Sequence, residues 1–246
     1  MEDRENLTEE EFLRNYDSSK YKKPSVTVDN IIFCINNLGD RDTKSNETKS
    51  EDTKNLGDRG TKTVEYFNCD MEVLLIRRGN YPDKGKWAFP GGFIEMDENL
   101  EESALRELRE ETFIEGLDFQ QLQAFGDVGR DKRDRIITVA YLALIKEKKE
   151  AKAGDDAKEA SWFKVECRKT PINNNAGEYI LDICLRNNEL EICPKVKVIS
   201  KKGYILENKS YEIIDKSDIA GDHAKLLSVA IEKVKEIERL KSYEDR

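Results

Sequence analysis

A glycine pair followed by a carboxylate-rich helix constrains the fold of this chain more than any other sequence feature. Gly91 and Gly92 interrupt an apolar run, and the periodicity that follows predicts a helix from Leu100 to Thr112, with Asn99 and Glu102 as its capping box. Because an α-helix advances by about 100° per residue, one flank of this helix carries acidic side chains while the other packs into a core. The acidic residues on that flank are Glu107, Glu110 and Glu111.

Three carboxylates within one helical turn indicate a bound cation. Like charges about 4 Å apart repel by around 1 kcal/mol in water and by more where water is excluded, so a cation would reverse the sign of the interaction. Oxygen ligands beside a backbone carbonyl suit Mg²⁺ or Mn²⁺, and these ions share the oxygens of a substrate phosphate. The single histidine, His223, excludes sites built from several imidazoles. The alternative interpretation is a solvated helix rich in Glu and Arg.

The spacing of these residues favours the metal site. The stretch closely resembles the Nudix box, Gly-x5-Glu-x7-Arg-Glu-U-x-Glu-Glu-x-Gly-U, in which U is a bulky aliphatic residue. The matching residues are Gly92, Glu98, Arg106, Glu107, Leu108, Glu110, Glu111 and Ile114. One position departs, because Phe113 replaces the second glycine of the pattern, where a glycine would ease a left-handed helix end.

The resemblance implies a role for each charged residue of the stretch. The residues that would bind the divalent ions are Glu107, Glu110, Glu111 and, through its main-chain carbonyl, Gly91. Glu98 and Arg106 would lie behind these ligands, with Arg106 holding a glutamate in orientation. The implied reaction is the attack of a metal-activated water on one phosphorus of a diphosphate.

The flanks of the box resemble the ADP-ribose pyrophosphatase branch of the superfamily. These flanks are residues 86–91, 130–135 and 222–223. The resemblance implies hydrolysis of ADP-ribose or a related sugar nucleotide, with AMP and ribose 5-phosphate as the products from ADP-ribose, and it implies a homodimer. Two alternatives stay open: a Nudix-like transcriptional regulator that senses a ligand, and a nucleotide-triphosphate or RNA-end hydrolase of the same superfamily.

The charge balance disfavours a general DNA or RNA binder. The chain carries a formal net charge of −9, and residues 165–246, with 15 basic and 15 acidic side chains, are typical of hairpins rather than of a basic helix-turn-helix. A nucleotide diphosphate must nevertheless be attracted, so we expect local positive charge near the metals. The candidates for substrate binding are Arg130, Arg133 and Arg135, whose alternative is a solvated turn balanced by Asp131 and Asp134.

Three further residues with chemically useful side chains are interpreted as structural. His223 could act as a general base, but its place at the start of an amphipathic helix favours capping and packing. Trp87 and Phe89 could stack on adenine, but aromatic residues just before a glycine turn are more typical of a core. No base-stacking residue is therefore assigned.

Alternating strands and helices predict an α+β fold. The resemblance implies an α/β/α sandwich with a mixed sheet, to which a β-hairpin insertion before the C-terminal helix is added. Strands are expected over residues 25–35, 72–78, 119–128 and 136–145 and from residue 161, and the last helix over residues 222–241, capped by Asp222. The expected units are 1–24, a helical appendage that packs on the rest; 25–164, the Nudix core, with a mobile polar loop at 37–64; 165–221, the β-rich insertion; and 222–246, the C-terminal helix.

Composition indicates a cytoplasmic protein without a membrane segment. No run of 18 apolar residues is present, and the acidic N-terminus does not resemble a signal peptide. The five cysteines lack a Cys-x-x-Cys pair, so neither a disulfide framework nor a zinc knuckle is expected, and we interpret them as buried or half-buried thiols. Residues 37–44 recur at 55–62, which indicates a local duplication in a tolerant loop.

Overall fold

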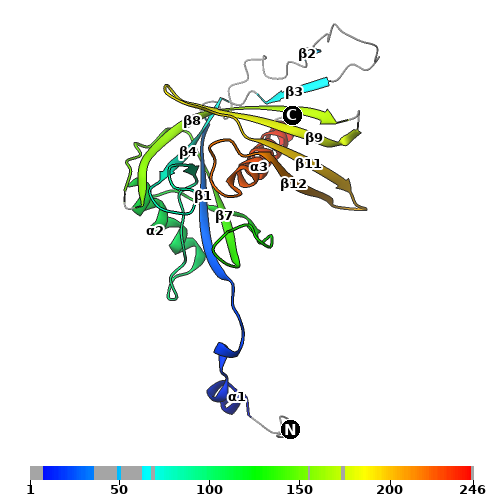
Figure 1. The fold of residues 1–246 in the computed structure, drawn as a ribbon. Coiled ribbons are helices and arrows are strands. Elements are labelled where there is room, and N and C mark those ends of the chain that lie inside the picture. The colour runs from blue at the N-terminus through cyan, green and yellow to red at the C-terminus, as the bar shows by residue number, and fades with distance from the viewer. Residues whose placement is uncertain are drawn as a thin grey trace.

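A mixed β-sheet organises the computed structural model of this chain, which describes residues 8–35, 49–50, 63–67, 70–154, 156–172 and 175–244 (Figure 1). The helices are α1 (Glu9–Asn15), the 3₁₀ helix η1 (Ser18–Lys20), α2 (Leu100–Thr112) and α3 (His223–Glu244). The strands are β1 (Ser25–Ile35), β2 (Lys49–Ser50), β3 (Thr63–Phe67), β4 (Met71–Arg78), β5 (Trp87–Ala88), β6 (Gln120–Phe125), β7 (Ile136–Ile145), β8 (Ala157–Ile172), β9 (Asn175–Arg186), β10 (Glu191–Ile192), β11 (Lys195–Lys202) and β12 (Glu207–Asp215).

The sheet combines one parallel strand pair with antiparallel pairs. Its strand order is β12-β11-β9-β8-β4-β1-β7-β6, and the short strands β10, β3 and β5 pair with β9, β8 and β4. β1 runs parallel to β7, with Ser25 opposite Ile136, and antiparallel to β4, with Phe33 opposite Val73. The predicted mixed sheet is confirmed.

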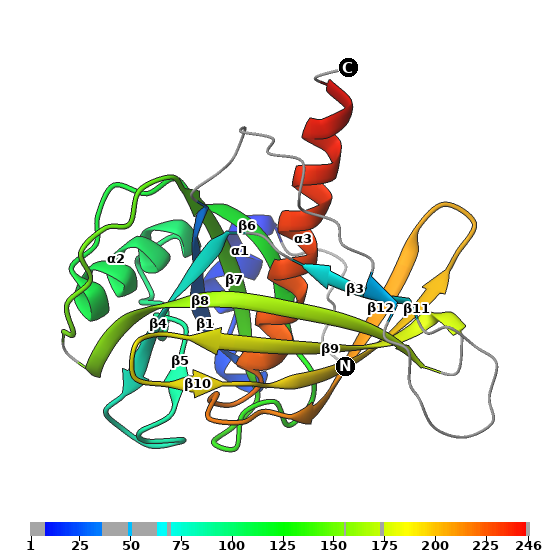
Figure 2. The same cartoon turned by 90° about the horizontal axis from the view of Figure 1, so that it is seen from above.

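Helices cover both faces of the sheet at β1. Val28 and Ile32 pack on the side of α2, whereas Ile31 and Phe33 pack on the side of α3, because successive side chains of a strand point to opposite faces. Figure 2 shows α2 and α3 separated by β1 and β4. This double covering explains why β1 is buried without interruption from Thr27 to its end. The expected α/β/α arrangement is therefore confirmed.

The elements that carry the clearest periodicity match their predicted bounds. β1 and α2 begin and end at the predicted residues, and the Asn99 N–H donates to Glu102 Oε2 at 2.8 Å, as a capping box requires. β6 is shorter than expected and ends at Phe125, while β8 begins at Ala157, four residues earlier than its apolar signal.

The strands that follow β8 extend the same sheet (Figure 2). Their alternating apolar residues are buried, including Ile192, Val196 and Val198. Glu232 of α3 accepts hydrogen bonds from the hydroxyls of Tyr179 and Tyr211, so α3 is fastened to this extension. Residue 165, the expected start of the insertion, lies inside the continuous strand β8, and the division of the chain into units stays a prediction.

The N-terminal helix α1 forms as predicted but does not pack on the sheet. Thr8 and Glu11 make the expected capping box. No residue of α1 is buried, and the side chains expected to pack are 50% exposed or more, namely Phe12, Leu13 and Tyr16. Figure 1 shows α1 well away from the sheet. The prediction of packing was wrong, because helix capping acts locally and is satisfied without a partner surface.

Some sequence predictions fall outside the described residues. These are the mobility of most of the loop 37–64, the duplicated segments within it, and the state of Cys69. Among the described helices, none is long and apolar enough to cross a lipid bilayer.

The cysteine prediction was wrong for one pair. Cys34 and Cys167 are buried, as expected, but Cys184 and Cys193 form a disulfide. The register of the β9–β10 hairpin explains the pairing. Leu185 lies opposite Ile192, and because the strands are antiparallel, the residues that follow in register are Cys184 and Cys193. Spacing motifs do not report hairpin register, so the sequence pattern did not reveal this contact.

Helix α2 ends at the residue that departs from the Nudix pattern. Phe113 adopts the left-handed conformation, with φ 58° and ψ 19°, and its N–H donates to the Arg109 carbonyl at 2.9 Å. A left-handed backbone costs about 1–2 kcal/mol for residues other than glycine. The helix thus ends in the left-handed conformation that a glycine would ease, although the residue at this position is the bulky Phe113.

We expect Phe113→Gly to have a free energy of unfolding about 1 kcal/mol higher than Phe113→Ala, because both variants lose the ring and only glycine relieves the left-handed strain. Chemical denaturation of the two variants measures the difference. Equal stabilities would show that this helix end is not strained.

Candidate active site

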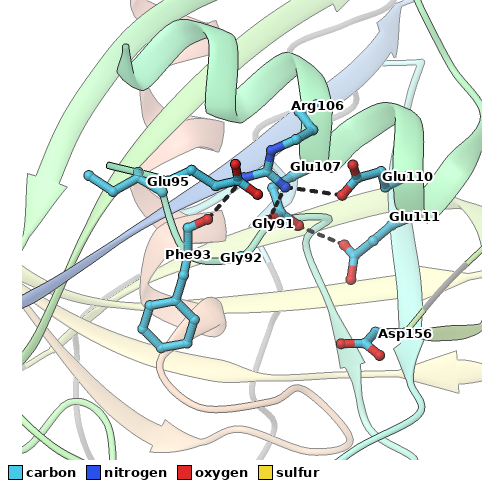
Figure 3. Close-up of a pocket in the computed structure, with 10 residues that line it drawn as sticks. Gly91, Gly92, Phe93, Glu95, Arg106, Glu107, Glu110, Glu111 and Asp156 are labelled. Carbon is cyan, nitrogen blue, oxygen red and sulfur yellow. Dashed lines mark hydrogen bonds and ion pairs between the residues drawn. The ribbon is translucent and has the colours of Figure 1, made fainter. Parts of the chain in front are cut away.

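Helix α2 places its acidic flank on the wall of a cavity of about 670 Å³ (Figure 3). The described residues that line it are Gly91, Gly92, Phe93, Ile94, Glu95, Arg106, Glu107, Glu110, Glu111 and Asp156. The three carboxylates expected on one flank, and the glycine turn expected beside them, therefore share one hollow. No residue of β9 to β12 is among the lining residues just named.

Arg106 ties the acidic residues together. Its Nε donates to Glu98 Oε1 at 2.7 Å, and its Nη1 donates to Glu107 Oε1 at 2.8 Å and to Glu110 Oε2 at 3.0 Å. Its Nη2 donates to the Phe93 carbonyl at 3.0 Å. The fork of a guanidinium can satisfy acceptors on the helix and on the preceding turn at the same time.

Glu98 lies at the outer end of this network. Ser103 Oγ donates to Glu98 Oε2 at 2.7 Å, so the carboxylate accepts from both Arg106 and Ser103. These two hydrogen bonds lower the pKa of Glu98 to about 2. Glu98 is therefore a permanent anion that orients Arg106.

The turn before α2 is clamped onto β1. The Asn30 N–H donates to the Pro90 carbonyl at 2.7 Å, and the Val28 N–H donates to the Gly92 carbonyl at 2.9 Å. A Cβ on Gly91 would lie 2.1 Å from the Val28 carbonyl oxygen, and a Cβ on Gly92 would lie 2.5 Å from a carboxylate oxygen of Glu107. Close approach to the backbone of a strand therefore requires a glycine at Gly91, whereas at Gly92 a larger residue would displace the carboxylate of Glu107.

Glu111 is the most buried carboxylate of the site. Its residue is 6% exposed, and its Oε2 accepts from the Gly91 N–H at 2.8 Å. Burial raises the pKa of Glu111 to about 8, against the opposing effects of the Gly91 hydrogen bond and the Arg78 charge. Burial also raises the pKa of Glu107, which Arg106 opposes. The hydrogen bonds and positive charges of the protein therefore do not fully compensate the negative charges of these two carboxylates.

This donor set fits a hard divalent ion. Oxygen donors in a partly buried, electrically undercompensated cluster are the ligands that Mg²⁺ and Mn²⁺ prefer. The oxygens of Glu107, Glu110 and Glu111 do not all lie within 4.8 Å of one another; among the residues described, that spacing is met by Cys184, Glu191 and Cys193. Because Mg²⁺ usually keeps several water ligands, the three glutamates need not all contact one ion.

The structure separates the three candidate substrate arginines. Arg130 is buried and donates from Nε and Nη2 to both carboxylate oxygens of Asp222, at 2.9 and 2.7 Å. The carboxylate of Asp222 is thus engaged by Arg130, while its carbonyl accepts the Lys225 N–H. Arg135 donates to the Asp127 carbonyl at 3.3 Å. Neither Arg130 nor Arg135 lines the cavity.

Arg133 is the candidate that lies beside the cavity. Its guanidinium stands 5.1 Å from the ring centroid of Phe93, a lining residue, and is paired with Asp131 at 2.8 Å. The role of the three arginines in substrate binding stays a prediction, and Arg133 contacts a residue that lines the hollow.

The residues interpreted as structural are indeed packed. Trp87 is fully buried, edge to face with Phe163 at 4.8 Å, and Phe89 is 2% exposed. His223 Nδ1 accepts from the Phe89 N–H at 3.0 Å, and His223 does not line the cavity. The core interpretation of the two aromatic residues is confirmed.

Sequence reasoning missed Asp156 and Arg78. Asp156 precedes β8 and supplies a carboxylate to the cavity from outside α2, and its Oδ1 accepts from the Asn80 amide at 2.8 Å (Figure 3). Arg78, at the end of β4, lowers the pKa of Glu111 through its charge. No local signal in the sequence pointed to Asp156.

Comparison with known proteins agrees with this geometry. The NUDIX domain profile matches residues 59–182, half of the chain. An ADP-ribose pyrophosphatase from Methanocaldococcus jannaschii is 43% identical over 144 residues, which cover 57% of this chain and 84% of that protein. An ADPR responsive transcriptional repressor from Acinetobacter baylyi is 32% identical over 161 residues, which cover 65% of this chain and 52% of the repressor, so the match spans about half of the repressor's length.

One solved structure matches almost the whole chain. The crystal structure of a MutT/nudix family protein from Enterococcus faecalis has a TM-score of 0.60 and 27% identity, and it covers 94% of this chain and 70% of that protein. The likeness therefore extends past the NUDIX segment into the β-rich extension. From its box, its site and these matches, the chain belongs to the Nudix family.

Proposed function

We propose that this protein hydrolyses the diphosphate bond of a nucleoside diphosphate derivative, with Mg²⁺ or Mn²⁺ as cofactor and with ADP-ribose or a related sugar nucleotide as substrate. The observation that carries the proposal is the presence of Glu107, Glu110 and Glu111 beside the Gly91 turn on one cavity wall. The substrate class is supported by the 43% identity to an ADP-ribose pyrophosphatase over most of that protein's length.

The acidic side chains divide the work of the site. The residues that would hold the ions are Glu107, Glu110, Glu111 and the carbonyl of Gly91. When bound, the metal supplies a Lewis acid that offsets the charge of the diphosphate and lowers the pKa of a water. Arg106 binds one oxygen each of Glu107 and Glu110, so the other oxygen of each carboxylate would be the one to contact an ion. Glu98 holds Arg106 in that position.

Asp156 is suited to accept the proton of the attacking water. Like Glu95, it is a lining carboxylate from outside α2, and Figure 3 shows it on the same side of the cavity as Glu111. Only one of its oxygens is engaged by Asn80. A carboxylate beside a metal cluster can take up a proton without being a metal ligand.

Arg133 is suited to bind the substrate. Its cation beside Phe93 counters the negative charge of the cavity at its rim, and a guanidinium binds phosphate oxygens through parallel hydrogen bonds. Because Asp131 holds it now, the diphosphate would have to replace this half-buried partner.

A second candidate is sensing of ADP-ribose without cleavage, and the similarity to the transcriptional repressor favours it. A DNA-binding helix-turn-helix needs two consecutive helices. The described part of residues 165–244 contains strands and the single helix α3. The 43% identity to an ADP-ribose pyrophosphatase, over 84% of that protein's length, makes hydrolysis the better supported function.

Metal binding should depend on pH through Glu111. Since the pKa of this carboxyl is raised to about 8, a cation must displace its proton below that pH. We expect the affinity for Mn²⁺ to rise by up to about tenfold per pH unit between pH 6 and 8 and then to level off. Titration calorimetry in buffers of different ionisation enthalpy measures both affinity and proton release. A pH-independent affinity, or an unchanged slope in Glu111→Gln, would contradict this assignment.

Removing one charge from the cluster should stop the reaction without unfolding the protein. We expect Glu107→Gln and Glu111→Gln each to lower kcat on ADP-ribose with Mg²⁺ by about 100-fold or more, because each loses an anionic ligand. The matched control is Glu101→Gln, on the same helix but in its exposed first turn, which should keep full activity.

Two results would contradict the proposed hydrolysis. Full turnover in either cluster variant would remove the metal site from the mechanism. Tight binding of ADP-ribose by the wild-type protein without production of AMP would favour sensing instead. A panel of diphosphates and triphosphates, compared by kcat/KM, separates the ADP-ribose class from the other Nudix substrates.

A further inference from the structure

His223 is the only histidine of the chain. It does not line the cavity, but several contacts hold its imidazole in one orientation. It is the first residue of α3, and its side chain is 12% exposed. Its Nδ1 accepts from the Phe89 N–H at 3.0 Å, and its ring stacks on the Phe89 ring, with centroids 5.5 Å apart and planes 13° apart. Two separate contacts therefore hold the imidazole against one residue.

Phe89 begins the segment that delivers Gly91 to the acidic cluster. Pro90 has no N–H, so the Phe89 amide is the last main-chain donor before Gly91, whose own N–H donates to Glu111. One side of this segment is bound to β1 through the Pro90 and Gly92 carbonyls. The His223 imidazole holds its other side.

The residues before α3 continue the same contact. The Trp87 N–H donates to the Asp218 carbonyl at 2.9 Å, and the Ala220 N–H donates to the Trp87 carbonyl at 2.8 Å. These bonds align residues 218–223 alongside the segment that starts at Trp87. His223 makes the contact nearest to Gly91 in this series.

Asp29 lies beside the other nitrogen of the imidazole. Because Nδ1 accepts a hydrogen bond, the ring proton sits on Nε2, which faces Asp29 Oδ1 at 3.6 Å. The other oxygen of Asp29 accepts from the Thr138 hydroxyl at 2.6 Å. A carboxylate on the far side of a histidine sets its tautomer and orientation.

We propose that His223 is a positioning residue for the metal site: its Nδ1 holds the Phe89 amide and thereby fixes the Gly91 carbonyl and N–H against Glu111. The inference rests on the proposed metal-dependent function. Because the contact acts on the ligand turn and not on the substrate, its loss should weaken metal binding more than substrate binding. Groups that orient metal ligands typically change metal affinity by about 10–100-fold when they are removed.

Three substitutions separate positioning from packing. Asn places its side-chain oxygen where Nδ1 stands, Gln reaches the position of Nε2, and Leu fills the space without an acceptor. We expect His223→Leu and His223→Gln to raise the Kd for Mn²⁺ by about tenfold or more. His223→Asn should stay within about threefold of the wild-type Kd, because it keeps the acceptor for the Phe89 N–H. Titration calorimetry with Mn²⁺ alone measures these values.

The matched control removes a hydrogen bond of α3 far from the turn. Tyr211→Phe loses the bond to Glu232 and should lower stability without changing the Kd for Mn²⁺. If His223→Leu does not fold, the comparison of His223→Asn with His223→Gln still tests the positioning role. Equal Kd values in all folded His223 variants, or a weakened Kd in Tyr211→Phe, would overturn the positioning role. Since Mn²⁺ binding is read without substrate, a wild-type protein that binds the ion but cleaves no diphosphate would contradict the proposed function and not this inference.

The single histidine also gives a direct spectroscopic test. In protein labelled with ¹⁵N-histidine, one imidazole contributes, and we expect an unprotonated Nδ1 and a protonated Nε2. Mg²⁺ should shift the His223 resonances in the wild type. A proton on Nδ1 would exclude the hydrogen bond from Phe89 and so overturn the proposal, as would resonances that do not respond to saturating Mg²⁺.

Discussion

The burial of Glu111 is the constraint on which the rest of the site depends. A carboxylate that is nearly excluded from water stays ionised only if positive charge or hydrogen-bond donors compensate it. The protein supplies one main-chain N–H from Gly91 and the charge of Arg78, and this is too little to prevent a raised pKa. The remaining demand is what a divalent cation can satisfy. The proposed metal site would therefore form where this acidic protein buries a carboxylate.

Binding of a cation at Glu111 requires a rigid main chain in the turn before α2. β1 binds the Gly91 turn from one side, and residues 218–223 bind the segment just before it, at Trp87 and Phe89. Residues 218–223 are the end of the connection between β12 and α3 and the first residue of α3. The start of α3 therefore joins the β-rich extension to the Gly91 turn. The extension therefore supports the site from behind, while the residues that line the cavity come from the turn, α2 and the segment before β8.

Local chemistry made much of this predictable from sequence. The bounds of α2 and β1, the glycine turn and the acidic flank all follow from periodicity and spacing within about one element. Contacts between distant segments did not follow. Arg130 pairs with Asp222, 92 residues away, which removes it from the cavity, and the register of a hairpin pairs Cys184 with Cys193. Asp156 reaches the cavity only through the pairing of β4 with β8. Helix α1 shows the converse, since its local signals were correct and its expected packing was not.

The most direct measurement is anomalous X-ray scattering from crystals of this protein soaked in Mn²⁺. The central claim, that the acidic flank of α2 and the Gly91 turn form the cation site, predicts anomalous peaks in the cavity among Glu107, Glu110, Glu111 and the carbonyl of Gly91. An empty cavity at millimolar Mn²⁺, with the ion bound only elsewhere, for example at Glu191 beside the two disulfide cysteines, would contradict it.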